Sequence, residues 1–540
     1  MLLFIACLAA NYFAVVALER FVKPVSEGRR PLFHRMSLLA AMPSMVFYLT
    51  VFMISYRPVF SLTVTLIVYV AVIVLNNAKY AALREPLVFA DFALLRQAIE
   101  HPALYVKYIG VFNIILVFAG AALAIVFGLA FEPPLVARES LTAFFPTAIY
   151  LFLLTGTIYA AVRGPFRPAI RDLLLRFGPT TDVTRDKDQL SLIVCLIGYF
   201  FLANEPEHPE SKRQRHAAKR REARYIRGAM RPSQTHPRFR DGPLPDVVAV
   251  QSESFFDARR LSATIDGDLL ANFDKLARRA SYSGRLQVPA FGANTMRTEF
   301  AFLSGLPNEA LGVHRFNPYL QLCKAPIWTI AAQLRSMGYR TVCIHPFASS
   351  FFDRDEVYPN LGFDAFLDID SFPDAERNGP YVSDRAVADK IEAVLAETDQ
   401  PQFIFAITME NHGKWESDRL DGQDAPVDLA NPPLGSVELA LYLHHLRNAD
   451  AMIAQITSAL KARDGDGVFC LFGDHVPSFP DLYQRLGFDD SRTDYLVWKK
   501  RGAHPRRIDV SADTLGRLVL DTVFNEANHA PVDHVVSPTG

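Results

Sequence analysis

Long apolar runs in the first 205 or so residues constrain this chain more than any other feature. The runs cover residues 2–18, 37–55, 58–77, 109–131 and 144–162. A helix that crosses a bilayer needs about 20 predominantly apolar residues, so these runs predict membrane-spanning helices. A further run, residues 190–203, is shorter. The mean hydropathy of the whole chain is +0.12. Since the apolar excess lies in this part, we expect a membrane domain over residues 1–204.

Basic residues in two loops indicate the topology. The loops 19–36 and 163–188 are rich in Arg and Lys, and the positive-inside rule places both in the cytoplasm. If residues 190–203 cross the membrane, the chain has six spans and an N-terminus outside. If residues 190–203 lie in the interface, it has five spans and an N-terminus inside. Both arrangements place the C-terminal half outside the cytoplasm.

A strongly basic stretch follows the apolar runs. Residues 208–232 are rich in Arg and Lys and contain few aliphatic side chains. We interpret residues 205–244 as a linker, with contact to anionic lipid headgroups as the alternative. Nucleic acid is not an expected partner, because no aromatic residues alternate with these charges and the formal net charge of the chain is -1.

From residue 245 onward, apolar strand-like runs alternate with amphipathic helices. Strands are expected within residues 246–255, 339–345, 403–412 and 468–475. Near-continuous apolar strands that alternate with helices predict a mostly parallel sheet with helices on both faces. The carboxyl ends of parallel strands meet at one edge of a sheet, and open α/β sheets bind their ligands there.

Polar, reactive side chains stand at the ends of these four predicted strands. They are Glu253, His345, His412, Asp474 and His475. Glu253, Asp474 and His475 together offer two carboxylates and one imidazole, a donor set that suits Mn²⁺, Zn²⁺ or Mg²⁺. The alternative is that Asp474 caps a turn and His475 is a surface histidine. Because another strand delivers Glu253 to the same edge, we predict a site for one divalent cation.

The candidate nucleophile lies in FGANTMRTEFAFLSGLP, residues 291–307. Its Gly and Asn favour a tight turn ahead of a helix, which places Thr295 at or near the N-cap. Thr295 then either caps the helix, with Thr298 or Glu299 completing the cap, or presents its hydroxyl to a phosphate held at the helix N-terminus. A metal ion beside that hydroxyl favours the alkoxide and makes a nucleophile. The residues alone leave the choice between Thr295 and Thr298 open.

Five motifs, taken in order, resemble those of the lipoteichoic acid synthase and phosphoglycerol transferase family, within the alkaline phosphatase and sulfatase superfamily. They are VVAVQSESF, GANTMRTEFAFLSGLP, FFDRDEVYPNLGFDAF, TMENHGKW and LFGDH. The resemblance covers roughly residues 245–500. It implies a multi-pass α-helical membrane domain with five spans, an N-terminus inside and an interfacial segment. An α/β sulfatase-like domain with a mostly parallel sheet is then expected over residues 245–540.

The same resemblance implies a metal-dependent nucleophile. Thr295 would be both the nucleophile and a metal ligand, and the family's T-x-x-x-E-F register selects it over Thr298. Glu253, Asp474 and His475 would complete the ligand set of one divalent ion. Mn²⁺ is the expected ion, with Mg²⁺ and Zn²⁺ as alternatives.

Three further residues would bind the substrate if the resemblance holds. Arg354 would bind the phosphate, to which the guanidinium fork is suited. His412 would contact the phosphoglycerol or move a proton, and His345 would line the same pocket. Without the resemblance, Arg354 is better interpreted as an ion pair within its own DRDE run.

The implied function is metal-dependent transfer of phosphoglycerol from phosphatidylglycerol to a cell-envelope acceptor, through a covalent threonine intermediate. The acceptor would be a glycan or polyglycerolphosphate. The protein is expected in the bacterial inner membrane, with its catalytic domain on the periplasmic or extracellular side.

Two alternatives remain for the function. One is phosphoethanolamine transfer, although those enzymes usually carry disulfides that the scattered cysteines here do not support. The other is an inactive envelope protein, against which the complete ligand set argues. Formylglycine-dependent sulfatases are excluded, because no Cys or Ser stands in the required C/S-x-P-x-R context.

Overall fold

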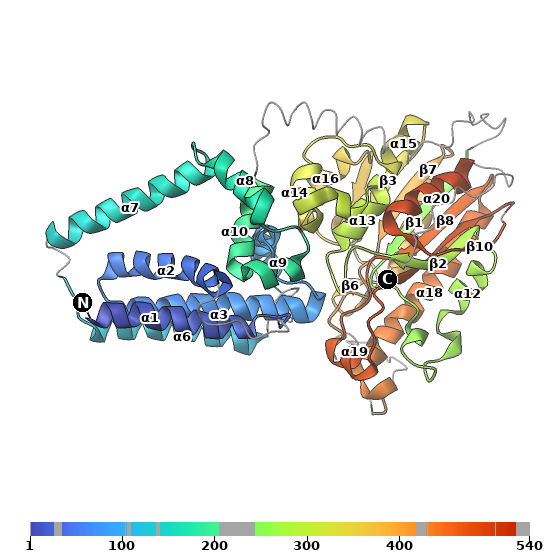
Figure 1. Cartoon of the computed structure of the whole chain (residues 1–540). Helices are drawn as coiled ribbons and strands as arrows, with labels where there is room; N and C mark the ends of the chain where they lie inside the picture. Colours follow the sequence, from blue (N-terminus) through green and yellow to red (C-terminus); the bar gives the residue numbers. More distant parts are fainter. Residues whose placement is uncertain are drawn as a thin grey trace. The chain divides into compact units, whose positions relative to one another are not determined.

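The computed structural model describes residues 2–25, 35–102, 104, 110–136, 141–204, 244–416, 428, 430–502 and 504–524. The chain divides into two compact units, Met1–His208 and Pro209–Gly540, and Figure 1 shows the elements of each. The basic linker predicted over residues 205–244 lies, except for its last residue, outside the described residues.

The N-terminal unit is helical throughout its described parts. Its helices are α1 (Leu2–Leu18), η1 (Glu19–Phe21), α2 (Arg35–Ser55), α3 (Pro58–Leu83), η2 (Phe89–Leu94), α4 (Leu95–Glu100), α6 (Val111–Phe131), α7 (Leu141–Val162), α8 (Arg167–Phe177), α9 (Val183–Leu190) and α10 (Leu192–Ala203). Pro58 begins α3, at a position where its missing N–H has no helical partner to lose. The α-helical membrane domain expected from the apolar runs is thereby confirmed.

Five of these helices are long and apolar enough to cross a membrane, namely α1 (continued through η1), α2, α3, α6 and α7. Helices α1, α2 and α3 pack on one another, α6 packs on α3, and α7 packs on α2. A buried hydrogen bond of 2.9 Å from Asn11 Nδ2 to Ser44 Oγ joins α1 to α2. Because α10 has 12 residues, it is too short to cross a bilayer as one straight helix. Its interfacial placement stays a prediction.

The C-terminal unit is built around a nine-stranded sheet among the described residues. The strand order is β10-β2-β9-β8-β1-β7-β3-β4, and β11 pairs with β2. The strands are β1 (Asp246–Ser252), β2 (Tyr282–Gln287), β3 (Arg340–Ile344), β4 (Ala365–Leu367), β7 (Gln402–Ile407), β8 (Gly467–Gly473), β9 (Thr493–Lys499), β10 (Arg506–Arg507) and β11 (Val510–Ser511), with a separate hairpin of β5 (Arg377–Asn378) and β6 (Tyr381–Val382).

The main sheet is mostly parallel, as predicted. Strands β8, β1, β7, β3 and β4 pair in parallel. The sequence interpretation did not include β9, which runs antiparallel to both β8 and β2. The short helix α19 (Pro480–Leu486) and the turn after it reverse the chain between β8 and β9, and so allow the antiparallel pairing.

The helices of this unit are η3 (Ala258–Arg260), η4 (Gly267–Leu270), α12 (Ala271–Ala277), α13 (Thr295–Ser304), η5 (Asn308–Phe316), α14 (Tyr319–Leu322), α15 (Ile330–Ser336), η6 (Phe351–Asp353), α16 (Arg354–Asn360), η7 (Ile369–Ser371), α17 (Asp384–Ala396), η9 (Pro433–Gly435), α18 (Val437–Ala462), α19 (Pro480–Leu486) and α20 (Ala512–Phe524). Ser383 and Ser436 cap α17 and α18 by accepting backbone N–H bonds.

Helices cover both faces of the sheet, and its central strands are buried along their whole length (Figure 1). On one face α12, α17 and α18 share a core with alternate residues of β1 and β8, such as Val248 and Phe469. On the other face, Phe302 of α13 packs against Phe405 of β7 and Phe472 of β8, with ring centroids 5.6 and 4.6 Å apart. This two-sided burial explains the continuous apolar runs in the sequence.

Candidate metal centre

Parallel pairing brings the ends of β1 and β8 together. Ser252 pairs with Gly473 in register, so the next residue on each strand, Glu253 and Asp474, leaves the sheet at the same edge. Gly473 is required by this arrangement, because a Cβ there would lie 1.9 Å from the carbonyl oxygen of Phe255. The sheet thus places two carboxylates side by side.

Glu253, Asp474 and His475 form one compact cluster. One ligand atom from each lies within 4.8 Å of the others. The His475 Nε2 atom is 3.4 Å from Glu253 Oε1 and 3.3 Å from Asp474 Oδ2. The three residues are buried, with at most 3% of each exposed. Residues that are 221 positions apart in the sequence, such as Ser254 and His475, therefore meet at one point.

The charges of this cluster call for a cation. Burial, and then the neighbouring Asp474 carboxylate, raise the pKa of Glu253 well above its usual value. Burial also raises the pKa of Asp474. His475 Nδ1 lies 3.1 Å from the carbonyl oxygen of Val476, which can only accept, so Nδ1 carries the proton and the Nε2 lone pair faces the two carboxylates. Two carboxylates and one imidazole nitrogen fit a divalent ion such as Mn²⁺, Mg²⁺ or Zn²⁺.

Thr295 lies at the start of α13, beside this cluster. The N-cap is Asn294, whose φ of 66° is left-handed, and Thr295 is the first helical residue. Gly292 N–H donates to the Val476 carbonyl oxygen at 3.2 Å, which fastens the turn to the segment that carries His475. The half-buried Thr295 side chain acts as a hydrogen-bond donor to the Asp474 carboxyl and lowers its pKa.

Thr298 has a different environment from Thr295. It is fully buried, and its hydroxyl donates to the Asp474 backbone carbonyl oxygen at 2.7 Å. Neither Thr298 nor Glu299 caps the helix, since the N-cap of α13 has no side-chain hydrogen bond. The capping alternative for this segment is therefore wrong. Of the two threonines, Thr295 is therefore the one whose hydroxyl faces the cluster.

Arg354 forms a buried ion pair with Glu299, with 1% and 0% of the two residues exposed. Glu299 lies on α13, so the alternative of an ion pair within the DRDE run is wrong. Glu299 Oε2 also accepts hydrogen bonds from the hydroxyls of Tyr319 and Tyr358, at 2.7 and 2.6 Å. Arg354 follows two residues with positive φ, Phe352 and Asp353, which turn it toward the interior. The predicted contact between Arg354 and a substrate phosphate stays a prediction.

The two predicted substrate-binding histidines lie near one another at the same edge of the sheet. His345 follows β3, is 1% exposed, and its Nδ1 lies 3.3 Å from the Ile407 carbonyl oxygen. Burial, then the charge of Arg354, lowers the pKa of His345 well below its usual value, and His412 contributes to the same shift. His412 Nδ1 lies 2.7 Å from the Gly413 carbonyl oxygen and 3.2 Å from the Tyr381 hydroxyl. His345 is therefore neutral near pH 7.

Two residues that position this cluster were missed by sequence reasoning. Ser254, in the motif QSESF, bonds to both carboxylates through its N–H and its hydroxyl. Thr408 follows β7, and its hydroxyl oxygen accepts the Glu253 N–H at 3.0 Å. Only adjacency to Glu253 marked Ser254 in the sequence, and no signal marked Thr408.

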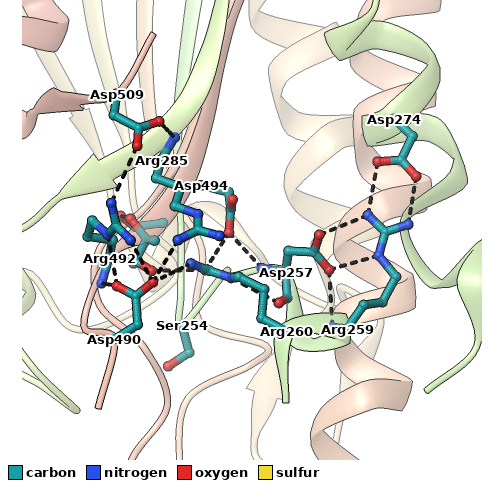
Figure 2. Close-up of polar contacts among 12 residues, drawn as sticks. Ser254, Asp257, Arg259, Arg260, Asp274, Arg285, Asp490, Arg492, Asp494 and Asp509 are labelled. Carbon is teal, nitrogen blue, oxygen red and sulfur yellow. Dashed lines mark hydrogen bonds and ion pairs between the residues drawn. The ribbon is translucent and has the colours of Figure 1, made fainter. Parts of the chain in front are cut away.

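An Arg–Asp network holds the segment that follows Ser254 (Figure 2). Asp257 N–H donates to Asp494 Oδ2 at 2.7 Å, and Arg260 donates to the same carboxylate at 2.8 Å. Arg259 bridges Asp257 to Asp274 on α12. The network ties the chain after Glu253 to β9 and to α12, which fixes the exit of β1 from both sides.

Comparisons with known proteins agree with this architecture. The family model described as Sulfatase matches residues 245–535. A capsular polysaccharide biosynthesis protein, RkpI, from Rhizobium meliloti is 29% identical over 511 residues, which cover 91% of this chain and 88% of that protein. Lipoteichoic acid synthase 1 from Bacillus subtilis is 28% identical over 145 residues, 26% of this chain and 21% of its own length.

A solved membrane protein shares the whole fold. Lipooligosaccharide phosphoethanolamine transferase A (EptA) from Neisseria meningitidis aligns over 97% of this chain and 95% of its own, with a TM-score of 0.53 and 13% identity. A likeness at this identity concerns the fold alone, a membrane domain followed by a sulfatase-like domain. The family model covers more than half of the chain and spans every residue of the cluster described above. The chain therefore belongs to the sulfatase family, in the superfamily that also contains the lipoteichoic acid synthases and other phosphotransferases.

Proposed function

We propose that this protein transfers phosphoglycerol from phosphatidylglycerol to a cell-envelope acceptor, through a covalent intermediate on Thr295. One observation carries the proposal. A half-buried hydroxyl at the start of α13 faces a buried cluster of two carboxylates and one imidazole. That arrangement suits a hydroxyl nucleophile beside a divalent ion.

Glu253, Asp474 and His475 are the residues that would hold the ion, with the Thr295 oxygen as a fourth ligand. Mn²⁺ is our first choice because the donor set mixes hard oxygens with one imidazole. When bound, the ion neutralises charge on the Thr295 oxygen and the phosphate and lowers the pKa of the hydroxyl.

The reaction proceeds in two displacements. In the first, a bond forms from Thr295 Oγ to phosphorus while the bond from phosphorus to the diacylglycerol oxygen breaks. Threonine loses its proton, and diacylglycerol gains one. In the second, an acceptor hydroxyl oxygen bonds to phosphorus, the bond from phosphorus to Thr295 breaks, and the acceptor proton returns to the threonine oxygen.

Three residues would assist these displacements. Arg354 would stabilise charge on the non-bridging oxygens, and its charge already acts on Glu253 and His345 at the site. His345, neutral and buried, would line the pocket. His412, half-buried, would contact the glycerol or accept a proton.

The membrane domain supports a lipid donor. Five helices long enough to span a bilayer keep the enzyme in the layer that holds phosphatidylglycerol, and this confinement raises the encounter rate. The basic loops of the membrane domain favour a catalytic domain on the periplasmic or extracellular side. The similarity to a protein named for capsular polysaccharide biosynthesis favours a glycan as the acceptor. Polyglycerolphosphate is the alternative.

The test uses the full-length protein in detergent with Mn²⁺ and headgroup-labelled phosphatidylglycerol. We expect release of diacylglycerol and label on the protein, both lost in Thr295→Ala. Ser304→Ala is a matched control, because it removes a hydroxyl of α13 whose partners among the described residues are the Phe300 carbonyl oxygen and the Leu306 N–H. Diacylglycerol release that survives Thr295→Ala would remove Thr295 as the nucleophile.

The same assay separates the competing functions. Turnover of phosphatidylethanolamine in place of phosphatidylglycerol would indicate the phosphoethanolamine reaction instead. All five cysteines are free, which favours phosphatidylglycerol, since phosphoethanolamine transferases of this superfamily usually carry disulfides. Inertness toward both lipids would indicate an inactive envelope protein.

A further inference from the structure

Ser254 contacts all three residues of the candidate cation site. Its backbone N–H donates to Asp474 Oδ1 at 2.8 Å, and its hydroxyl donates to Glu253 Oε1 at 3.1 Å. The Ser254 Oγ atom also lies 3.5 Å from His475 Nδ1. Only 1% of Ser254 is exposed, so water does not replace these contacts.

The backbone of Ser254 is held in a left-handed conformation, with φ of 53°. A residue other than glycine rarely adopts this conformation unless the surrounding structure imposes it. Here the Tyr442 hydroxyl of α18 donates to the Ser254 carbonyl oxygen at 2.8 Å, and Thr408 holds the preceding N–H, that of Glu253, at 3.0 Å. The left-handed turn is what directs the N–H of Ser254 at Asp474 while its side chain points back to Glu253.

The contacts of Ser254 oppose the repulsion between the Glu253 and Asp474 carboxylates. Two buried carboxylates repel one another, and each turns away from the other unless donors hold it in place. Ser254 supplies one donor to each carboxylate and adds no charge that would compete with a cation. His475 uses Nδ1 for the Val476 carbonyl oxygen, so its Nε2 stays directed at the cluster.

We infer that Ser254 is a positioning residue that holds the Glu253 and Asp474 carboxylates in place, beside His475, before a divalent cation binds. The inference rests on the proposed cation site and goes beyond it, since Ser254 itself is not a ligand. Partners outside the ligand set orient the ligands, and their loss typically weakens metal binding by about 10–100-fold.

The neighbouring Ser252 offers a matched control. It stands two residues earlier, at the end of β1, and is also 1% exposed. Its hydroxyl has no hydrogen-bond partner among the described residues. Ser252→Ala therefore removes a buried hydroxyl at the same strand end without touching the cluster.

The experiment measures Mn²⁺ affinity by calorimetry on the full-length protein in detergent, for wild type, Ser254→Ala, Ser254→Gly and Ser252→Ala. Melting temperatures in EDTA are measured in parallel. We expect both Ser254 variants to bind Mn²⁺ about tenfold more weakly or worse, and Ser252→Ala to bind like wild type. Glycine adopts positive φ without strain, so Ser254→Gly should melt in EDTA no lower than wild type. If Ser254→Ala fails to fold, the Mn²⁺ affinity of Ser254→Gly still tests the role of the Ser254 side chain.

The outcomes separate the existence of the cation site from the role of Ser254. If wild type binds no Mn²⁺, the cation site itself is wrong. If wild type binds and both Ser254 variants bind as tightly, the site stands and the inference about Ser254 is overturned. A lower melting temperature of Ser254→Ala in EDTA, with unchanged Mn²⁺ affinity, would show a purely structural serine and would also overturn it.

Discussion

Two buried glutamates in this protein, Glu253 and Glu299, have opposite surroundings. Glu299 is fully buried, and Arg354, Tyr319 and Tyr358 all donate to it. Glu253 is 3% exposed and meets the Asp474 carboxylate, the His475 imidazole and the Ser254 hydroxyl. The charge of Arg354 also acts on Glu253, but Arg354 forms its ion pair with Glu299.

This contrast separates a structural carboxylate from a metal ligand. A buried charge is stable when an opposite charge and hydrogen bonds satisfy it, and Glu299 meets that condition within the protein. Glu253 does not, because the charge that acts on it most strongly, that of Asp474, has the same sign. The environment of Glu253 is complete only when a cation joins it, whereas that of Glu299 is complete already.

The largest effect is expected at Glu299. Glu299→Ala leaves Arg354 buried without its partner, and the loss of one member of a buried pair costs about 3–5 kcal/mol in the free energy of unfolding. Denaturant unfolding of the full-length protein in detergent checks this value. Glu356→Ala is the control, because Glu356 is an exposed acid in the DRDE run that contains Arg354. Substitutions at exposed sites usually change stability by less than about 0.5 kcal/mol. Equal losses of stability in Glu299→Ala and Glu356→Ala would contradict the structural role of Glu299.

Glu253→Gln should weaken Mn²⁺ binding without lowering the stability of the metal-free protein. The neutral amide relieves the repulsion from Asp474, so we expect no loss of stability in EDTA. Mn²⁺ affinity, measured by calorimetry, should fall by more than about 100-fold, since removing a ligand exceeds the effect of an outer partner. A variant that loses stability in EDTA yet binds Mn²⁺ normally would show that Glu253 is structural, like Glu299.

Addition of a divalent metal should affect the Glu253 site and leave the pair of Glu299 and Arg354 unchanged. Mn²⁺ at about 100 times its dissociation constant should stabilise the wild-type protein by about 2.7 kcal/mol, and chelation should reverse the effect. We expect Arg354→Lys, a milder change in the complete pair, to retain this stabilisation. Melting curves with and without Mn²⁺ test both, and a wild-type protein indifferent to Mn²⁺, Mg²⁺ and Zn²⁺ would argue against a cation at Glu253.

The smallest effect on stability is expected at Asp384, a third buried carboxyl, at the start of α17. Its carboxyl is fully buried, and burial, then the charge of Glu410, raise its pKa well above 3.8. The folded chain therefore keeps a proton that the unfolded chain releases above about pH 4, so stability falls as pH rises toward the folded pKa. Asp384→Asn should remove this decline. Melting temperatures from pH 4 to pH 8 should show the variant gaining on wild type as pH rises, and parallel curves would contradict the assignment.

The fold was predictable because its signals are local. Long apolar runs indicate spanning helices, and buried strands that alternate with amphipathic helices indicate a parallel sheet. The roles of Ser254 and Thr408 were not predictable, because each hydrogen-bonds to a partner more than 150 positions away in the sequence. The partner of Arg354 was mispredicted for the same reason, since Glu299 lies 55 positions from it.

The two-part architecture and the residue types at the strand ends follow from the amino-acid order, since periodicity and hydrophobicity act over a few neighbouring residues. Which of these residues meet depends on how distant segments pack in three dimensions. Parallel register placed Asp474 beside Glu253. The packing of α13 directed the Thr298 hydroxyl to the Asp474 backbone oxygen, whereas the Thr295 hydroxyl bonds to the Asp474 carboxyl. Contacts across the sheet are set by the packing of distant segments, and no local pattern records them.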